Sequence, residues 1–142
     1  MFSNISDQSV RVAVNDTETL ASFCAETVPS DPDAATHQVY FLYCAGFIKI
    51  GVSKGLIRRL KDIQIGTPFP SQAVMLIRGG RITEQYMHFL YNEYHHRGEW
   101  FVLGPRLRAM IVAQAPPECL EWLAEEEAVH RAWIKEQAAA LG

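Results

Sequence analysis

The middle of the chain carries side chains of the types that act on phosphodiesters. Phosphate binding needs cationic donors, a hard metal ion needs an oxygen ligand, and an attacking water needs a proton acceptor. One aromatic residue, one lysine, one arginine, one carboxylate and one histidine in this region meet those needs: Tyr40, Lys49, Arg59, Glu84 and His88. This set makes the chain a candidate phosphodiester-cleaving enzyme.

Helical geometry distinguishes Arg59 from its neighbour Arg58. The apolar spacing predicts a helix over 55–65 whose buried face is centred near Leu56 and Leu60. At about 100° per residue, Arg58 then points into solvent, whereas Arg59 lies at the boundary and can lean over a neighbouring sheet. There its guanidinium could grip a phosphate with two donors. The alternative is an ordinary boundary arginine whose stem packs on the sheet.

Glu84 and His88 are four residues apart in a predicted helix over 82–94, so they share one helix face. Magnesium often takes only one or two protein carboxylates and fills its shell with water and substrate phosphate. Glu84 is therefore a candidate ligand for Mg²⁺, with Mn²⁺ as a substitute. The alternative is a solvated Glu–His pair on a surface helix.

Tyr40 and Lys49 fall on adjacent runs of β-branched and aromatic residues, over 39–45 and 47–52, which predict a hairpin turning at Gly46. An ammonium beside a phenol can lower the pKa of the phenol. Either a phenolate or a neutral amine could then accept a proton from water. Two alternatives stay open: Lys49 binds phosphate as a point charge, and Tyr40 is a core aromatic.

The net charge of −3 is unevenly distributed. Residues 38–109 hold ten Lys or Arg against four acidic residues, whereas both flanks are acidic. A basic centre of this kind suits a polyanion, although small domains also show such imbalance by chance. The adjacent histidines 95 and 96 point in different directions at a predicted helix end and add to this basic surface. The candidate substrate contacts are Gly51, Lys54, Arg58 and Lys61.

The remaining pattern predicts a single α+β domain with helical additions. A capped helix is expected over 16–28, and the segment 29–33 (Pro-Ser-Asp-Pro-Asp) is the best linker. Further elements are expected as a strand at 73–77, a turn at Gly98 that leads into the run 100–102 (Trp-Phe-Val), a helix from Pro105 to Pro116, and a long acidic helix from Glu118 onward. In the last helix, either Trp122 and Trp133 form a contact for a partner, or Trp122 and Leu123 simply pack onto the core.

Composition is typical of a globular protein, with 49% apolar and 20% charged residues in 142 positions. There is no charged n-region followed by an apolar h-region, and no apolar stretch long enough for a membrane span. The three cysteines are far apart and in no metal-ligand spacing, which predicts neither a disulfide framework nor a zinc site. A cytoplasmic location without membrane contact is therefore expected.

Taken together, these residues resemble the GIY-YIG nuclease superfamily, in its compact phage and bacterial branch. The two signature tripeptides correspond to 38–40 (Gln-Val-Tyr) and 49–51 (Lys-Ile-Gly). Arg59 falls at the position of the family's catalytic arginine, and Glu84 at that of its metal-binding glutamate. The segment 98–101 (Gly-Glu-Trp-Phe) is similar to one that often closes the domain in that branch. The match covers about 39–103, which is roughly half of the chain.

The resemblance implies a three-stranded antiparallel sheet flanked by helices, and Mg²⁺-dependent hydrolysis of DNA by in-line attack of water. Tyr40 matches the first signature tyrosine, whereas Lys49 replaces the second, so the general base is either Tyr40 assisted by Lys49 or Lys49 itself. His88 is similar to a histidine often found beside the glutamate. The first glycine of the signature is replaced by Gln38.

The expected organisation is an amino-terminal helical extension at 1–37, the nuclease domain at 38–109, and an acidic helical extension at 110–142. A homodimer or a protein partner would bind through the last helix. The main alternative is a non-catalytic nucleic-acid-binding or regulatory adaptor on the same scaffold. A third alternative is action on RNA, because nothing in the residues distinguishes RNA from DNA.

Overall fold

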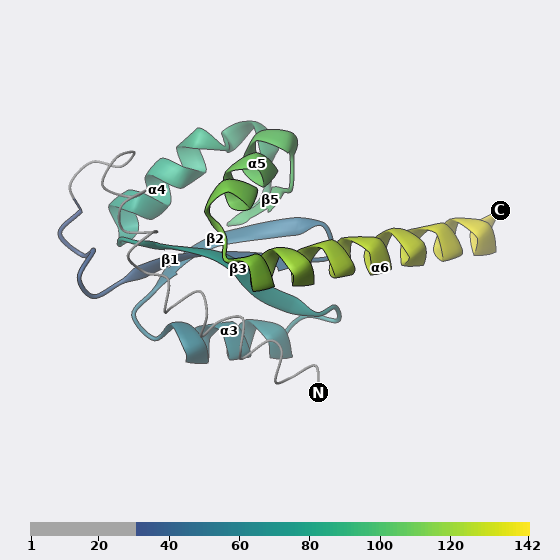
Figure 1. Cartoon of the computed structure of the whole chain (residues 1–142), viewed down its shortest axis with the longest axis horizontal. Coiled ribbons are helices and arrows are strands. Elements are labelled where there is room, and N and C mark those ends of the chain that lie inside the picture. The colour runs from purple at the N-terminus through teal and green to yellow at the C-terminus, as the bar shows by residue number, and fades with distance from the viewer. Residues whose placement is uncertain (1–30) are drawn as a thin grey trace.

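A computed structural model describes residues 31–142, so the helix expected over 16–28 and the start of the expected linker lie outside the described residues. The fold is α+β, with one antiparallel sheet and helices packed around it (Figure 1). The described elements are β1 (Gln38–Cys44), β2 (Phe47–Ser53), α3 (Leu56–Ile65), β3 (Ser71–Arg78), α4 (Arg81–Leu90), a 3₁₀ turn (Asn92–Tyr94), β4 (His95–Arg97), β5 (Trp100–Val102), α5 (Pro105–Gln114) and α6 (Pro117–Leu141).

The predicted hairpin is confirmed as β1 and β2, the centre of the sheet. Ala45 and Gly46 connect the strands and both have positive φ, at 50° and 91°. Two positive φ values are what a two-residue turn needs to match the twist of its flanking strands. In the resulting register Tyr40 lies opposite Gly51, and Leu42 lies opposite Lys49. Residues directly opposite share a face, so Tyr40 and Lys49 project from the same side of the sheet.

The expectation of a three-stranded sheet is wrong, because the sheet has five strands in the order β3-β1-β2-β5-β4. β5 pairs with β2, and β4 pairs with β5 across a tight turn at Gly98, whose φ is 54°. Each added strand is only three residues long, too short for an alternating pattern to reveal it in the sequence.

The helix expected over 82–94 ends at Leu90, so His95 and His96 belong to β4 and not to a helix end. Arg106 explains why the helix stops there. Its guanidinium lies over the ring of Tyr91 at 5.3 Å and donates a hydrogen bond to the Leu90 carbonyl, a group that a longer helix would have used internally.

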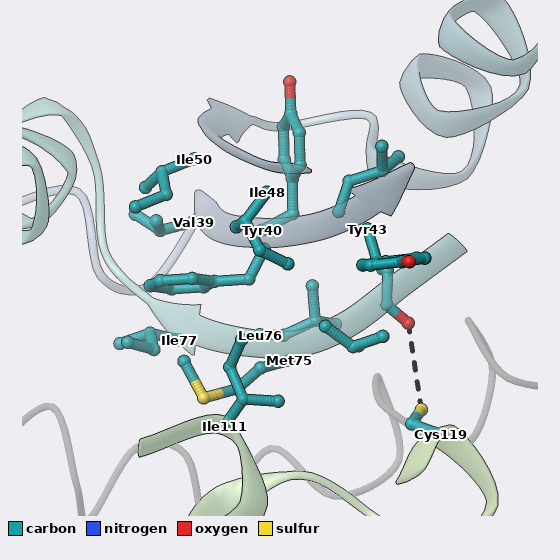
Figure 2. Close-up of a cluster of buried hydrophobic side chains, with 14 of the residues drawn as sticks. Val39, Tyr40, Tyr43, Ile48, Ile50, Met75, Leu76, Ile77, Ile111 and Cys119 are labelled. Atoms are coloured by element: carbon teal, nitrogen blue, oxygen red, sulfur yellow. Dashed lines mark hydrogen bonds between the residues drawn. The ribbon is translucent and has the colours of Figure 1, made fainter. Parts of the chain in front are cut away.

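The two faces of the sheet are covered by different helices, with α3 on one side and α4 and α5 on the other (Figure 1). The face toward α5 holds the larger core, which includes Val39, Phe41, Ile48, Ile50, Met75, Ile77, Met87, Leu107 and Ile111. Tyr40 projects from the opposite face (Figure 2). We call this second face, which carries Tyr40, Lys49 and Gly51, the Tyr40 face.

Helix α6 packs on the sheet through its first turns and on Phe69 through His130 and Trp133, and its remaining residues project from the domain (Figure 1). The Cys119 thiol contacts the Ala73 carbonyl at 3.8 Å, and the Trp122 ring meets the Tyr43 ring edge-on at 6.0 Å. Packing of Trp122 and Leu123 onto the core is therefore confirmed. The boundary expected at residue 110 falls inside α5, whose Ile111 is buried in the same core.

None of the helices in the described range 31–142 combines the length and the apolar character needed to cross a membrane.

Asp31 fixes the start of α4 from a distant part of the chain. Its Oδ2 accepts hydrogen bonds from the Gly80 and Thr83 amides at 2.8 and 3.1 Å, and from the Thr83 hydroxyl at 2.7 Å. It thereby acts as an N-cap supplied by another segment. Burial opposes its charge, but the hydrogen bonds from Thr83, Asp33 and Gly80 outweigh burial and lower the pKa of Asp31. The segment at 31–33, expected as part of a linker, is thus anchored to the domain.

Replacement of Asp31 by alanine is expected to lower the free energy of unfolding by about 1 kcal/mol or slightly more, because α4 loses its cap. Urea denaturation of the whole chain at neutral pH measures this change. Glu136→Ala, which removes an exposed carboxylate of α6, is the matched control. Equal losses in the two variants would contradict the capping role.

Candidate functional site

Tyr40 lies at the centre of the site, with its ring packed against Gly51 on the neighbouring strand. The side chain is 0% exposed, and a Cβ at position 51 would overlap the ring and hydroxyl of Tyr40. Gly51 is therefore needed for the position of the ring, whatever contact its backbone makes with substrate. The buried Tyr40 hydroxyl has no hydrogen-bond partner among the described residues.

Arg59 reaches the same hydroxyl from α3. Leu56 and Leu60 form the buried face of α3, and Arg59 lies beside them at the boundary, as the helical spacing predicts. Contact with the Tyr40 hydroxyl raises the pKa of Arg59, although the two groups do not form a hydrogen bond of ordinary geometry. In turn, burial raises the pKa of Tyr40, while the Arg59 charge acts in the opposite direction. Arg58 points away, on the exposed surface of α3.

Glu84, in the first turn of α4, faces a second carboxylate that the sequence-based prediction missed. Burial and the neighbouring carboxylate of Glu99 raise the pKa of Glu84 from its ordinary 4.5 to about 7. The Glu84 Oε2 atom is buried and has no hydrogen-bond partner among the described residues. Glu99 lies in the turn between β4 and β5, and only the pairing of β5 with β2 brings it here. The sequence signal was the segment 98–101, which was interpreted only as the end of the domain.

Lys49 lies against the side chain of Glu99. Its Nζ is 3.2 Å from Glu99 Oε1 and 5.5 Å from the centre of the Trp100 ring. Both contacts attract the positive charge of an ammonium. The geometry therefore favours Lys49 as a source of positive charge over Lys49 as a neutral proton acceptor.

His88 is held by the backbone of β2. Its Nε2 lies 2.8 Å from the Ile50 carbonyl, and its ring meets Phe101 edge-on at 5.0 Å. These contacts hold α4 against β2 at the residue before Gly51. The structure thus gives His88 a positioning role, and direct action in catalysis stays a prediction.

The basic surface is smaller than the charge count suggests. Arg106 and Arg108 are paired with Glu93 and Glu127, respectively, so their charge is already balanced within the chain. Three other cations stand exposed at spacings of four and three along α3 and the residue before its cap: Lys54, Arg58 and Lys61. They form a cationic strip next to Arg59.

The carboxylates suit a hard divalent cation. Over residues 31–142, no three Asp, Glu, His or Cys side chains converge to hold a metal ion. Two carboxylates are nevertheless enough for Mg²⁺, which usually keeps several waters and binds substrate phosphate. The unpartnered, buried Oε2 of Glu84 facing Glu99 is the kind of oxygen that such an ion would satisfy. Glu84 and Glu99 would hold the ion.

Comparisons of the chain with protein-family models, with curated proteins and with solved structures return no match. The function of the chain is therefore inferred from the chemistry of the site.

The Glu84 carboxylate is expected to make folding pH-dependent. Between about pH 4.5 and pH 7, the folded protein keeps a proton that the unfolded chain has released. The free energy of unfolding should therefore fall as the pH rises through this window. Urea denaturation at pH 4.5 and pH 7.5, without divalent cations, measures the fall.

Glu84→Gln carries no ionisable group and should flatten the pH dependence, so that this variant is the more stable protein at pH 7.5. Glu136→Gln, which removes an exposed carboxylate of α6, is the matched control. If wild type and Glu84→Gln lose stability in parallel, the Glu84 carboxylate is not held protonated by its surroundings.

Proposed function

We propose that the chain is a divalent-metal-dependent endonuclease that hydrolyses DNA phosphodiester bonds. The observation that carries this proposal is the convergence of Tyr40, Arg59, Lys49, Glu84 and Glu99 from two strands, a turn and two helices. At the centre of this site, the Tyr40 hydroxyl and the Glu84 Oε2 atom lack hydrogen-bond partners among the described residues, so both could bind a substrate or an ion. The resemblance of the two tripeptides, Arg59 and Glu84 to the GIY-YIG nucleases supports the same chemistry.

Each side chain would have a separate task. Arg59, exposed on α3, would bind a non-bridging phosphate oxygen and stabilise the charge that develops on it. The Tyr40 hydroxyl would orient the attacking water, and its phenolate form would take the proton of that water as the water oxygen bonds to phosphorus and the opposite P–O bond breaks. Burial raises the pKa of Tyr40, so the adjacent Arg59 charge, which lowers it, is needed for this role. A bound Mg²⁺ would supply Lewis-acid polarisation of the phosphate and stabilise the leaving oxygen.

The exposed cations on α3 and just before it would bind the DNA backbone. Arg58 and Lys61 lie on the same helix as Arg59, and Lys54 immediately precedes its cap, so a DNA strand that follows them would deliver a phosphate to Tyr40. Phosphate contacts of this type position a duplex without reading its sequence. Sequence selectivity would then come from a second copy or a protein partner bound to α6. The dispersed cysteines place this activity in the cytoplasm in our proposal.

Plasmid cleavage in Mg²⁺ tests the proposal. Arg59→Ala and Glu84→Ala are each expected to lower the cleavage rate by about 10²-fold or more, because each removes stabilisation of the developing charge. Arg131→Ala, which removes an exposed arginine of α6, is the matched control and should cut like wild type.

Single-stranded DNA and RNA of equal length serve as parallel substrates. Cleavage of RNA alone would replace DNA as the substrate. Equal cleavage by all variants would point to a contaminating nuclease and refute the site. Tight DNA binding without cleavage on any substrate would favour the non-catalytic adaptor.

A further inference from the structure

We propose that Glu99 is a second carboxylate ligand for the divalent cation. We also propose that the Lys49 ammonium pairs with the Glu99 carboxylate in the metal-free protein and that the incoming ion displaces it. This inference rests on the proposed function, since it concerns the metal of that same site. It assigns a role to a residue outside the two signature tripeptides, and to the lysine that replaces the usual tyrosine.

The backbone holds Glu99 in place independently of its side chain. Its carbonyl accepts a hydrogen bond from the Ile50 amide at 2.9 Å, and the next residue, Trp100, lies opposite Lys49 in the β2–β5 pair. Gly98, with a φ of 54°, makes the tight turn that precedes it. The carboxylate of Glu99 is therefore presented to Glu84 by the sheet and not by a free loop.

The Tyr40 hydroxyl is a second feature that indicates a ligand. The Tyr40 side chain is 0% exposed, and its hydroxyl contacts Arg59 but forms no hydrogen bond of ordinary geometry with any described residue. The charges of Arg59, Glu99 and Glu84 all act on it. A buried hydroxyl without a partner costs stability. A cation with its water shell between this hydroxyl and the two carboxylates would supply partners to all three.

The Lys49 ammonium already neutralises part of the negative charge of the two carboxylates. Its Nζ pairs with Glu99 at 3.2 Å, and its charge also acts on Glu84. A divalent ion bound by both carboxylates would have to compete with this ammonium. Once displaced, the flexible lysine side chain could turn to a phosphate oxygen, so that metal binding would release a substrate-binding group.

A Mn²⁺ titration of the whole chain tests both the ligand role of Glu99 and the competition by Lys49. Binding is measured as the loss of the free-ion signal in electron paramagnetic resonance. Glu99→Gln is expected to weaken Mn²⁺ binding by about tenfold or more, because ligand charge sets affinity for hard ions. Glu99→Asp keeps a carboxylate and should retain more affinity than Glu99→Gln. Lys49→Met should strengthen binding several-fold, since it removes the competing ammonium.

Glu93→Gln removes an acidic residue that is paired with Arg106 on the exposed surface, and it should bind Mn²⁺ like wild type. Circular dichroism confirms that each variant is folded. Wild-type affinity in Glu99→Gln would overturn the ligand assignment, as would a wild type that binds no Mn²⁺. Unchanged or weaker binding in Lys49→Met would overturn the competition. The Mn²⁺ titration contains no nucleic acid, so its result does not depend on cleavage. A chain that binds Mn²⁺ through Glu99 but cuts no substrate would refute only the nuclease proposal and not the ligand assignment.

Discussion

The register between β1 and β2 is the constraint on which both the core and the site depend. It places the Tyr40 ring against Gly51, where any side chain would collide with it. The same register puts Lys49 on the Tyr40 face and sends Ile48 and Ile50 into the opposite core. A slip of one residue would reverse all of these positions, burying the lysine and exposing the isoleucines. The turn at Ala45 and Gly46 prevents that slip, because its two positive φ values suit a two-residue connection.

The site around the Tyr40 hydroxyl is electrostatically unfavourable, in contrast to the apolar core on the other face of the sheet. It holds a half-buried carboxylate against another carboxylate, and a fully buried hydroxyl without a partner. Such arrangements lower stability unless a ligand relieves them, and they are more frequent at functional sites than elsewhere. Lys49 offsets part of the repulsion through its ion pair with Glu99. The large core on the other face and the remote cap from Asp31 supply the stability that the site lacks.

Local patterns predicted the parts of the fold that local forces determine. The hairpin, α3 and the placement of Arg59 beside the sheet follow from periodicity and from the glycine at the turn. The wrong predictions involve contacts between distant segments. Helix α4 ends at Leu90 because Arg106, sixteen residues further along the chain, binds the Leu90 carbonyl, and β5 pairs with β2. For the same reason Glu99 was missed as a site residue, and the segment at Asp31, which binds Thr83 across 52 positions, was interpreted as a linker. Single-residue spacing carries no information about such pairings.

An anomalous difference map from crystals grown with Mn²⁺ and a short DNA duplex would show directly where the ion and the phosphate bind. We expect one strong peak between the carboxylates of Glu84 and Glu99, with a backbone phosphate beside it in contact with Arg59. We also expect the Lys49 ammonium to leave Glu99 in that crystal. A duplex bound to another surface, or Mn²⁺ bound away from Glu84, would contradict the assignment of this face as a phosphodiesterase site.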